Sequence, residues 1–267
     1  MLYGAMNFPV VPVLDEIDTF AQLEFDYLEL TMDQPRAHYS IISENQTAIT
    51  KALEKYGMGI VCHLPTFVST ADLTDSIRRA AVTEMRRSLL VASDLGVEKV
   101  VLHPPVISGM GTFVPDIARG HAFEFLSEMV DQSDQLDITI CLENMMPRNG
   151  FGVEPDEFEI IFKAFPTLQF TLDTGHANLN NKGANRLNDL VKRFGDRINH
   201  VHLSDNLGKY DDHFALGKGN IDIYRLVKRL QAIGYDGTIT FEVFDDNRLM
   251  LTESRELVKE MLAAPGY

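Results

Sequence analysis

The stretch that decides the fold of this 267-residue chain is His200-Val201-His202-Leu203-Ser204-Asp205. Polar and apolar residues alternate along it, as in a strand whose side chains point in turn to its two faces. The stretch ends in polar residues, and Asp211-Asp212-His213 follows soon after. Because α/β folds place their chemistry at the carboxyl ends of buried strands, the stretch indicates a strand that delivers histidines and acids to a site.

Similar β-type runs recur along the whole chain and alternate with segments of helical apolar spacing. The β-type runs are Leu2–Phe8, Tyr27–Leu30, Gly59–Leu64, Lys99–His103, Ile138–Glu143, Leu168–Asp173, Ile198–Leu203 and Thr238–Phe244. The helical segments are Val13–Leu23, Ile49–Tyr56, Ile77–Leu95, Phe123–Ser133, Phe158–Phe165, Arg186–Phe194, Tyr224–Ile233 and Ser254–Leu262. Strand followed by helix, eight times, predicts a single-domain α/β fold over residues 1–267: a (β/α)8 TIM barrel with parallel strands.

An open, doubly wound sheet is the alternative architecture. No GxGxxG motif follows the first run, and polar residues end six or more of the runs, which a closed barrel explains better. Turn residues agree with the predicted elements. Gly96 and Gly234 stand where helices should stop, Pro115 suits a helix start, and Asn180-Asn181-Lys182-Gly183 has the composition of a loop.

The composition limits the possible functions. Hydrophobic residues make up 45% and charged residues 24%, as in a globular protein with a large core. The formal charge of −15 disfavours polyanionic partners. Only two cysteines occur, without a CxxC pair, and no apolar run suffices to span a bilayer, so we expect a cytoplasmic enzyme without disulfides or membrane partners. A homo-oligomer stays possible.

Every predicted strand from the third onward ends at or near residues able to bind a metal ion. In a barrel the carboxyl ends of all strands surround one mouth, so residues distant in sequence become neighbours there. Imidazoles combined with carboxylates suit zinc or manganese, whereas magnesium favours oxygen ligands. The candidates are His63, His103, Glu143, Asp173, His176, His202, Asp211, His213 and Glu242.

Other polar residues receive supporting or alternative interpretations. His200, which lies deeper in its strand, and Glu29 are candidates to support the site, although a purely structural role is open for both. Cys62 and Cys141 are interpreted as small buried hydrophobic residues. Two cations are candidates for contact with an anionic substrate, namely Arg148 and, in the turn Leu216-Gly217-Lys218-Gly219-Asn220, Lys218.

The motifs around these candidates resemble the xylose isomerase-like TIM-barrel superfamily across nearly the whole chain. The motifs are His63-Leu64-Pro65, His103-Pro104, Leu142-Glu143-Asn144, Leu172-Asp173-Thr174-Gly175-His176, His200-Val201-His202-Leu203-Ser204-Asp205, Asp211-Asp212-His213 and Phe241-Glu242. This superfamily contains sugar and sugar-phosphate isomerases and epimerases, and also the endonuclease IV type of abasic-site nuclease.

Resemblance to the isomerase and epimerase branch implies one divalent metal held by Glu143, Asp173, His202 and Glu242. The metal would polarise substrate oxygens and stabilise an enediolate, while the two glutamates, as catalytic acid and base, move protons beside a carbonyl. His63 and His176 would contact a small carbohydrate-like substrate.

Resemblance to the endonuclease branch implies three zinc ions shared by all nine candidates, which would act on a phosphodiester at abasic sites in DNA. Arg36 and Phe67 are candidates for a DNA-contacting rim, but three divalent ions would bring the charge only to about −9. The continuation Asn144-Met145-Met146-Pro147-Arg148 also departs from the small residues expected in that branch. The leading hypothesis is therefore an isomerase or epimerase, and the alternatives are the nuclease and a barrel that binds a metal or sugar without catalysis.

Overall fold

A closed ring of parallel strands forms the centre of the computed structural model, which describes residues 1–181 and 185–265. Each strand pairs with the next in the chain, and the last pairs with the first. The strands are β1 Leu2–Met6, β2 Tyr27–Thr31, β3 Gly59–His63, β4 Lys99–Leu102, β5 Thr139–Glu143, β6 Gln169–Asp173, β7 Ile198–Leu203 and β8 Thr238–Phe241. The predicted (β/α)8 barrel is confirmed.

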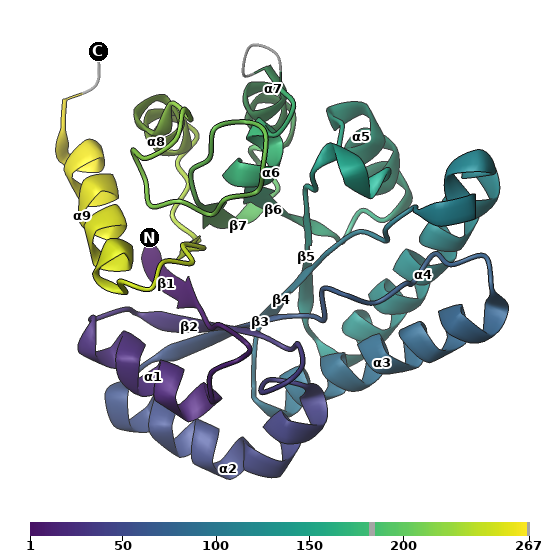
Figure 1. The fold of residues 1–267 in the computed structure, drawn as a ribbon, viewed down its shortest axis with the longest axis horizontal. Helices are drawn as coiled ribbons and strands as arrows, with labels where there is room; N and C mark the ends of the chain where they lie inside the picture. Colours follow the sequence, from purple (N-terminus) through teal and green to yellow (C-terminus); the bar gives the residue numbers. More distant parts are fainter. Residues whose placement is uncertain (182–184, 266–267) are drawn as a thin grey trace.

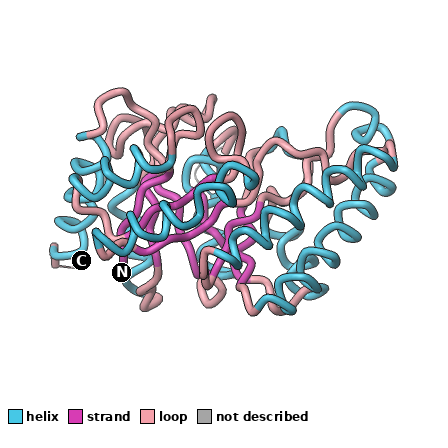
Figure 2. The backbone as a smooth tube through the Cα atoms, turned by 90° about the horizontal axis from the view of Figure 1, so that it is seen from below, coloured by secondary structure: helices cyan, strands magenta, loops and turns pink. Residues whose placement is uncertain are grey.

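Helices surround this ring in chain order (Figure 1). They are α1 Val13–Gln22, α2 Tyr39–Tyr56, α3 Asp75–Asp94, α4 Pro115–Leu136, α5 Pro155–Ala164, α6 Thr174–Asn178, α7 Asn185–Phe194, α8 Ile223–Ala232 and α9 Leu249–Ala263. Figure 2 shows the strands enclosed by helices and connected to them by loops. In the described part of the chain, no helix combines the length and apolar character needed to cross a bilayer.

Most helix boundaries differ from the predicted ones by a few residues. The largest error concerns α2, which begins at Tyr39 rather than Ile49 because its first half is largely polar and starts with the His38 side chain accepting the Ser40 N–H. Helix α4 begins at Pro115 as predicted and continues past the expected segment. Gly96 and Gly234 follow α3 and α8 with positive φ angles. The predicted loop 180–183 lies partly outside the described residues.

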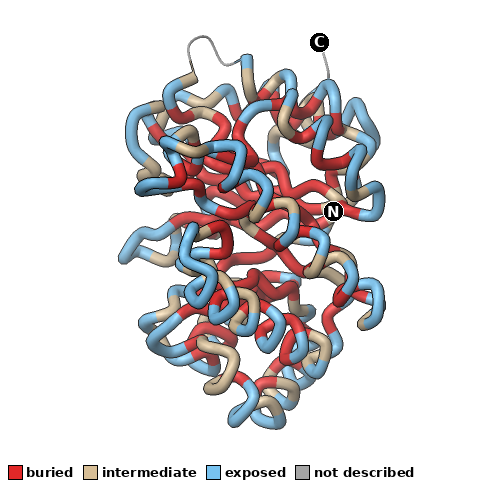
Figure 3. Tube along the Cα trace, turned by 90° about the vertical axis from the view of Figure 1, so that its right-hand side faces the viewer, coloured by how far each residue is buried: buried red, intermediate tan, exposed pale blue. Residues whose placement is uncertain are grey.

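The strands pack differently on their two faces. Side chains such as Leu30, Leu142 and Val201 face outward and form the main apolar core with the helices. The buried residues in Figure 3 accordingly concentrate around the strands, whereas exposed residues lie on the outer helices and loops. Cys62 and Cys141 are both free and buried. Alternate residues point into the barrel, and many of them are polar.

Candidate metal centre

Four polar side chains converge at the mouth of the barrel from the ends of β5, β6, β7 and β8. Nδ1 of His202 lies 3.4 Å from Glu143 Oε1, 3.6 Å from Asp173 Oδ2 and 3.7 Å from Glu242 Oε2. All four residues are buried. Glu242 follows β8 instead of lying within it, contrary to the predicted strand Thr238–Phe244, although its N–H still donates to Leu203 O.

This cluster fits a divalent cation. The four facing atoms, Glu143 Oε1, Asp173 Oδ2, His202 Nδ1 and Glu242 Oε2, are buried and have no hydrogen-bond partner among the described residues. Buried polar atoms without a partner are costly, and a cation would satisfy all four together. Glu143, Asp173 and His202 also lie close enough for one ion to contact all three. Carboxylate and imidazole ligands suit zinc or manganese.

A second group shares Glu143. His63 Nε2 lies 3.3 Å and His103 Nε2 3.1 Å from Glu143 Oε2, and these three residues form another possible metal site. His63 ends β3, whereas His103 lies just beyond β4, which stops at Leu102. Glu143 Oε2 thus faces His63 and His103, whereas Glu143 Oε1 faces His202.

A third group brings in the remaining candidates. Oδ2 of Asp211 lies 3.3 Å from His176 Nε2 and 3.3 Å from His213 Nε2. His213 Nδ1 also lies 3.1 Å from the backbone O of Glu242 and 3.7 Å from its Oε2, and His176 Nδ1 lies 3.1 Å from Glu143 Oε1. The structure therefore brings all nine candidate metal ligands into one connected cluster.

Two local motifs hold this cluster. Asp173 caps the short helix α6, since its Oδ1 accepts the His176 N–H at 2.6 Å and so places His176 above the strand end. Asn144 clamps β5 to β6 because its Nδ2 donates to Asp173 O and its Oδ1 accepts the Asp173 N–H, both at 2.8 Å. This role of Asn144 was not predicted, because it depends on which strands are neighbours.

Asp205 organises the loop that carries Asp211 and His213. Its fully buried carboxylate accepts four backbone N–H groups at 2.9–3.1 Å, from Asn206, Gly217, Gly219 and Ile221. A Cβ at Gly219 would lie 2.2 Å from Asp205 Oδ1, so this approach requires glycine. The loop is thus tied to the end of β7 at several points.

Burial and dense charge shift several pKa values in the metal-free cluster. Burial opposes the charged form of both Glu143 and His202. The charges of His103 and His202 nevertheless hold the pKa of Glu143 well below its ordinary value, and those of Glu29 and Glu143 hold the pKa of His202 well above its ordinary value. Burial raises the pKa of Glu242 to about 7, with Asp173 and Glu143 adding to the effect. Burial would lower the pKa of His213, but Glu242 and Asp211 raise it to about 9. A metal ion that bound here would therefore displace protons.

A cavity of about 910 Å³ opens above the cluster. Its lining includes His63, His103, His176, Asp211, His213 and Glu242, and also the predicted substrate contact Arg148. Lys209 and Tyr210 line it too, although neither was predicted. Lys218, the other predicted substrate contact, lies on an exposed turn and is not among the lining residues, and the same holds for Arg36 of the proposed rim.

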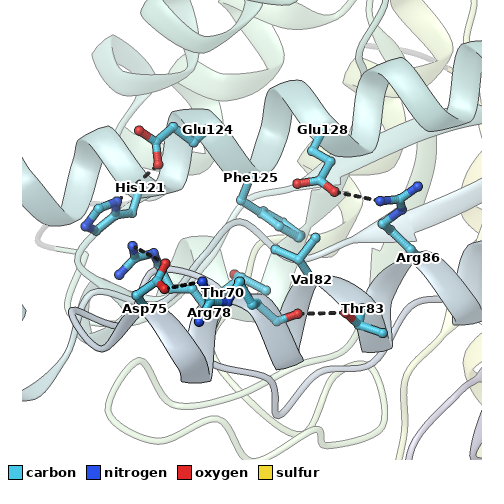
Figure 4. A pocket seen from close by; sticks show the side chains of 11 residues that line it. Thr70, Asp75, Arg78, Val82, Thr83, Arg86, His121, Glu124, Phe125 and Glu128 are labelled. Carbon is cyan, nitrogen blue, oxygen red and sulfur yellow. Dashed lines mark hydrogen bonds and ion pairs between the residues drawn. The ribbon is translucent and has the colours of Figure 1, made fainter.

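A second cavity, of about 360 Å³, lies outside the barrel between α3 and α4. Its charged side chains face one another: Arg86 pairs with Glu128 at 3.1 Å, and Arg78 with Asp75 at 3.4 Å (Figure 4). These cations and acids neutralise each other on exposed helix surfaces. The residues that line this second cavity therefore do not form a cluster of unpartnered polar atoms like the one at the barrel mouth.

Fold and site together define a (β/α)8-barrel protein with a potential metal centre at its mouth. Residues 17–264 match the family model for the xylose isomerase-like TIM barrel, and the chain belongs to this family. An uncharacterized protein of Methanocaldococcus jannaschii is 30% identical to it over 269 residues, covering 98% of this chain and 89% of that protein. The resemblance seen in the sequence motifs is confirmed.

The similar proteins include a solved structure and a more distant relative that carry functional names. The crystal structure of a D-tagatose 3-epimerase-like protein matches with a TM-score of 0.88 and 30% identity, covering 98% of this chain and 97% of that chain. A probable endonuclease 4 of Mycobacterium leprae is 23% identical over 218 residues, covering 78% of this chain and 82% of that protein.

Proposed function

We propose that this protein is a divalent-metal-dependent isomerase or epimerase of a small sugar or sugar phosphate. The observation that carries the proposal is the convergence of four unpartnered buried atoms, from Glu143, Asp173, His202 and Glu242, beneath an open cavity. The 30% identical epimerase-like structure supports the same reaction class. Two free buried cysteines are compatible with action in the cytoplasm.

The four residues would hold the ion, zinc or manganese. A bound divalent cation supplies positive charge that polarises the carbonyl and hydroxyl oxygens of a sugar. Glu143 ends β5 and Glu242 follows β8, and both border the same cluster. In the proposed reaction one carboxylate takes a proton from the carbon beside the carbonyl, which leaves an enediolate, and a carboxylic acid returns a proton to carbon.

Residues around the cavity would orient the substrate. His63 and His176 line its floor, and their ring nitrogens contact Glu143. In the proposed complex, sugar hydroxyls would take the place of some of these contacts and accept hydrogen bonds from the imidazoles. Arg148 and Lys209 provide positive charge at the cavity wall, which suits a phosphate substituent. Lys218, on an exposed turn outside the cavity lining, is the more remote of the two predicted substrate contacts.

Exchange of substrate hydrogen with solvent tests the proposal. Chain loaded with Mn²⁺ is incubated in D₂O with a panel of ketoses and ketose phosphates, and deuterium incorporation beside the carbonyl is followed by NMR. Glu143→Gln and Glu242→Gln should abolish incorporation while their circular dichroism spectra remain unchanged, and Asp212→Asn serves as the control. Full exchange in both glutamine variants would refute the proposed roles.

A second candidate is a zinc phosphodiesterase acting at abasic sites in DNA, favoured by the connected cluster of nine candidate ligands, which could hold one to three ions. The net charge of −15 and the sparse cations of the cavity lining weigh against a DNA partner. Its test is cleavage of a synthetic abasic duplex by zinc-loaded protein, lost in His103→Ala or His213→Ala. No incision at low salt and full zinc occupancy would eliminate it.

A further inference from the structure

Buried ionisable side chains lie inside the barrel below the metal cluster. Glu29 of β2 and His200 and His202 of β7 are completely buried and meet across the barrel interior. The buried apolar cluster Tyr27, Val61 and Val101 lies apart from the main core. Three ionisable side chains in such a place are costly unless each is well paired, so their arrangement needs a physical reason.

These side chains form a continuous hydrogen-bonded chain. Glu29 Oε1 lies 2.9 Å from His202 Nε2, and Glu29 Oε2 lies 2.8 Å from His200 Nε2. Because a carboxylate only accepts, both imidazoles donate from Nε2. Thr238 Oγ1 lies 2.6 Å from His200 Nδ1 and accepts from Lys99 Nζ at 3.1 Å.

This chain determines which nitrogen of His202 faces the mouth. With its Nε2 proton donated to Glu29, the ring turns Nδ1 toward the carboxylates of Glu143, Asp173 and Glu242, and a cation that displaces the Nδ1 proton would bind the lone pair left there. Strands β2 and β7 are not neighbours in the barrel, so the Glu29–His202 bond spans the interior. His200 occupies the second oxygen of Glu29 and thereby prevents that carboxylate from turning toward the mouth.

We propose that Glu29 is a positioning residue of the metal centre, which fixes His202 in the orientation and tautomer that offer Nδ1 to a divalent cation. His200, anchored by Thr238 and Lys99, fixes Glu29 in turn. Carboxylates that accept from a metal-bound histidine commonly serve this purpose and raise metal affinity. The inference rests on the metal site of the proposed function but not on the reaction performed there.

Metal affinity tests the role of Glu29 without reference to activity. Binding of Mn²⁺ is measured by titration calorimetry on the parent, Glu29→Ala and Glu29→Gln, and the absorption spectrum of each Co²⁺-loaded protein is recorded. Glu29→Ala should weaken Mn²⁺ binding roughly 10- to 100-fold and change the Co²⁺ spectrum. Glu29→Gln keeps an acceptor for His202 and should lose roughly tenfold at most.

A matched control separates positioning from stability. Glu16 is another buried carboxylate, paired with Arg248 at 2.9 Å. Glu16→Ala should lower the melting temperature but leave Mn²⁺ affinity and the Co²⁺ spectrum unchanged. If folded Glu29→Ala binds Mn²⁺ within about twofold of the parent and gives the same Co²⁺ spectrum, Glu29 does not position the metal ligand.

The tautomer of His202 can be observed in the unmodified chain. This measurement tests the inference even if Glu29→Ala does not fold. In Zn²⁺-loaded protein with ¹⁵N-labelled histidine, the chemical shifts of His202 should show a proton on Nε2 and the metal on Nδ1. Metal on Nε2 would overturn the inference. Failure of the parent to bind any divalent ion would remove the proposed metal centre as well, whereas metal binding with the wrong tautomer refutes this inference alone.

Discussion

Replacement of Asp205 by asparagine should release the loop that carries Asp211 and His213. The aspartate accepts two backbone N–H groups at each oxygen, Asn206 and Ile221 at Oδ1 and Gly217 and Gly219 at Oδ2. In Asp205→Asn an NH₂ group replaces one oxygen, so two buried donors lose their acceptor and face another donor. Each such loss costs about 1–3 kcal/mol, which gives about 2–6 kcal/mol for the variant.

The assay combines stability with local protection. Urea denaturation of the metal-free chain measures the loss in free energy of unfolding, and hydrogen exchange follows the Gly217, Gly219 and Ile221 amides. We expect the amides that face the new NH₂ group to exchange faster, either Gly217 and Gly219 or Ile221, and metal binding through Asp211 and His213 to weaken.

Asp212→Asn is the matched control, because Asp212 lies in the same loop and shows no hydrogen bond or ion pair among the described residues. It should behave like the parent in both measurements. If Asp205→Asn lost less than about 1 kcal/mol and kept its amide protection, then the carboxylate would not hold the loop.

Three further predictions concern stability, pH and thiol reactivity. Arg255 donates to the Leu23 and Glu24 carbonyls at 2.8 and 2.7 Å, so Arg255→Ala should lose about 2–4 kcal/mol in urea denaturation, whereas exposed Arg225→Ala should not. The His213 pKa of about 9 in the folded chain exceeds the ordinary 6.5, so its stabilisation is complete below pH 6.5 and lost as pH rises through 9. The melting temperature in EDTA should fall between pH 6.5 and pH 9. A melting temperature that stays constant over this pH range would contradict the raised pKa of His213. Burial raises the pKa of Cys141 to about 12 and also raises that of Cys62, so a thiol reagent at pH 8 should label both only in denaturant, and rapid labelling of folded protein would show accessible thiols.

The sequence was sufficient to predict the barrel and the gathering of the nine candidate ligands. Strand β7 matches its predicted bounds Ile198–Leu203, because alternating residues identify a strand with two different faces. Once the strands are known to be parallel and closed, their carboxyl ends must share one mouth. Proximity of His63 to Glu143 then follows from topology, although 80 residues separate them.

Other features of the site depend on three-dimensional geometry that the spacing of apolar residues along the sequence does not reveal. Glu29 could be assigned to the inward face of its strand, but its bond to His202 depends on which residues meet across the barrel. The loop around Asp205 is held by four backbone N–H groups, and every residue type except proline has such a group, so the sequence does not reveal these bonds. Lys218 was predicted on a tight turn facing an anionic substrate. The structure places it on an exposed turn outside the residues that line the cavity, and its contact with substrate stays a prediction.

The two-faced strands have a consequence for how this protein can change. Along β7, Val201 and Leu203 pack against the helices, while His200 and His202 face the interior. Alternate residues of the same short strands therefore stabilise the fold and supply the polar side chains of the barrel interior and mouth. Substitutions in one set leave the other largely in place, so the barrel can acquire new specificities without rebuilding the scaffold, while a one-residue slip of a strand would destroy both at once.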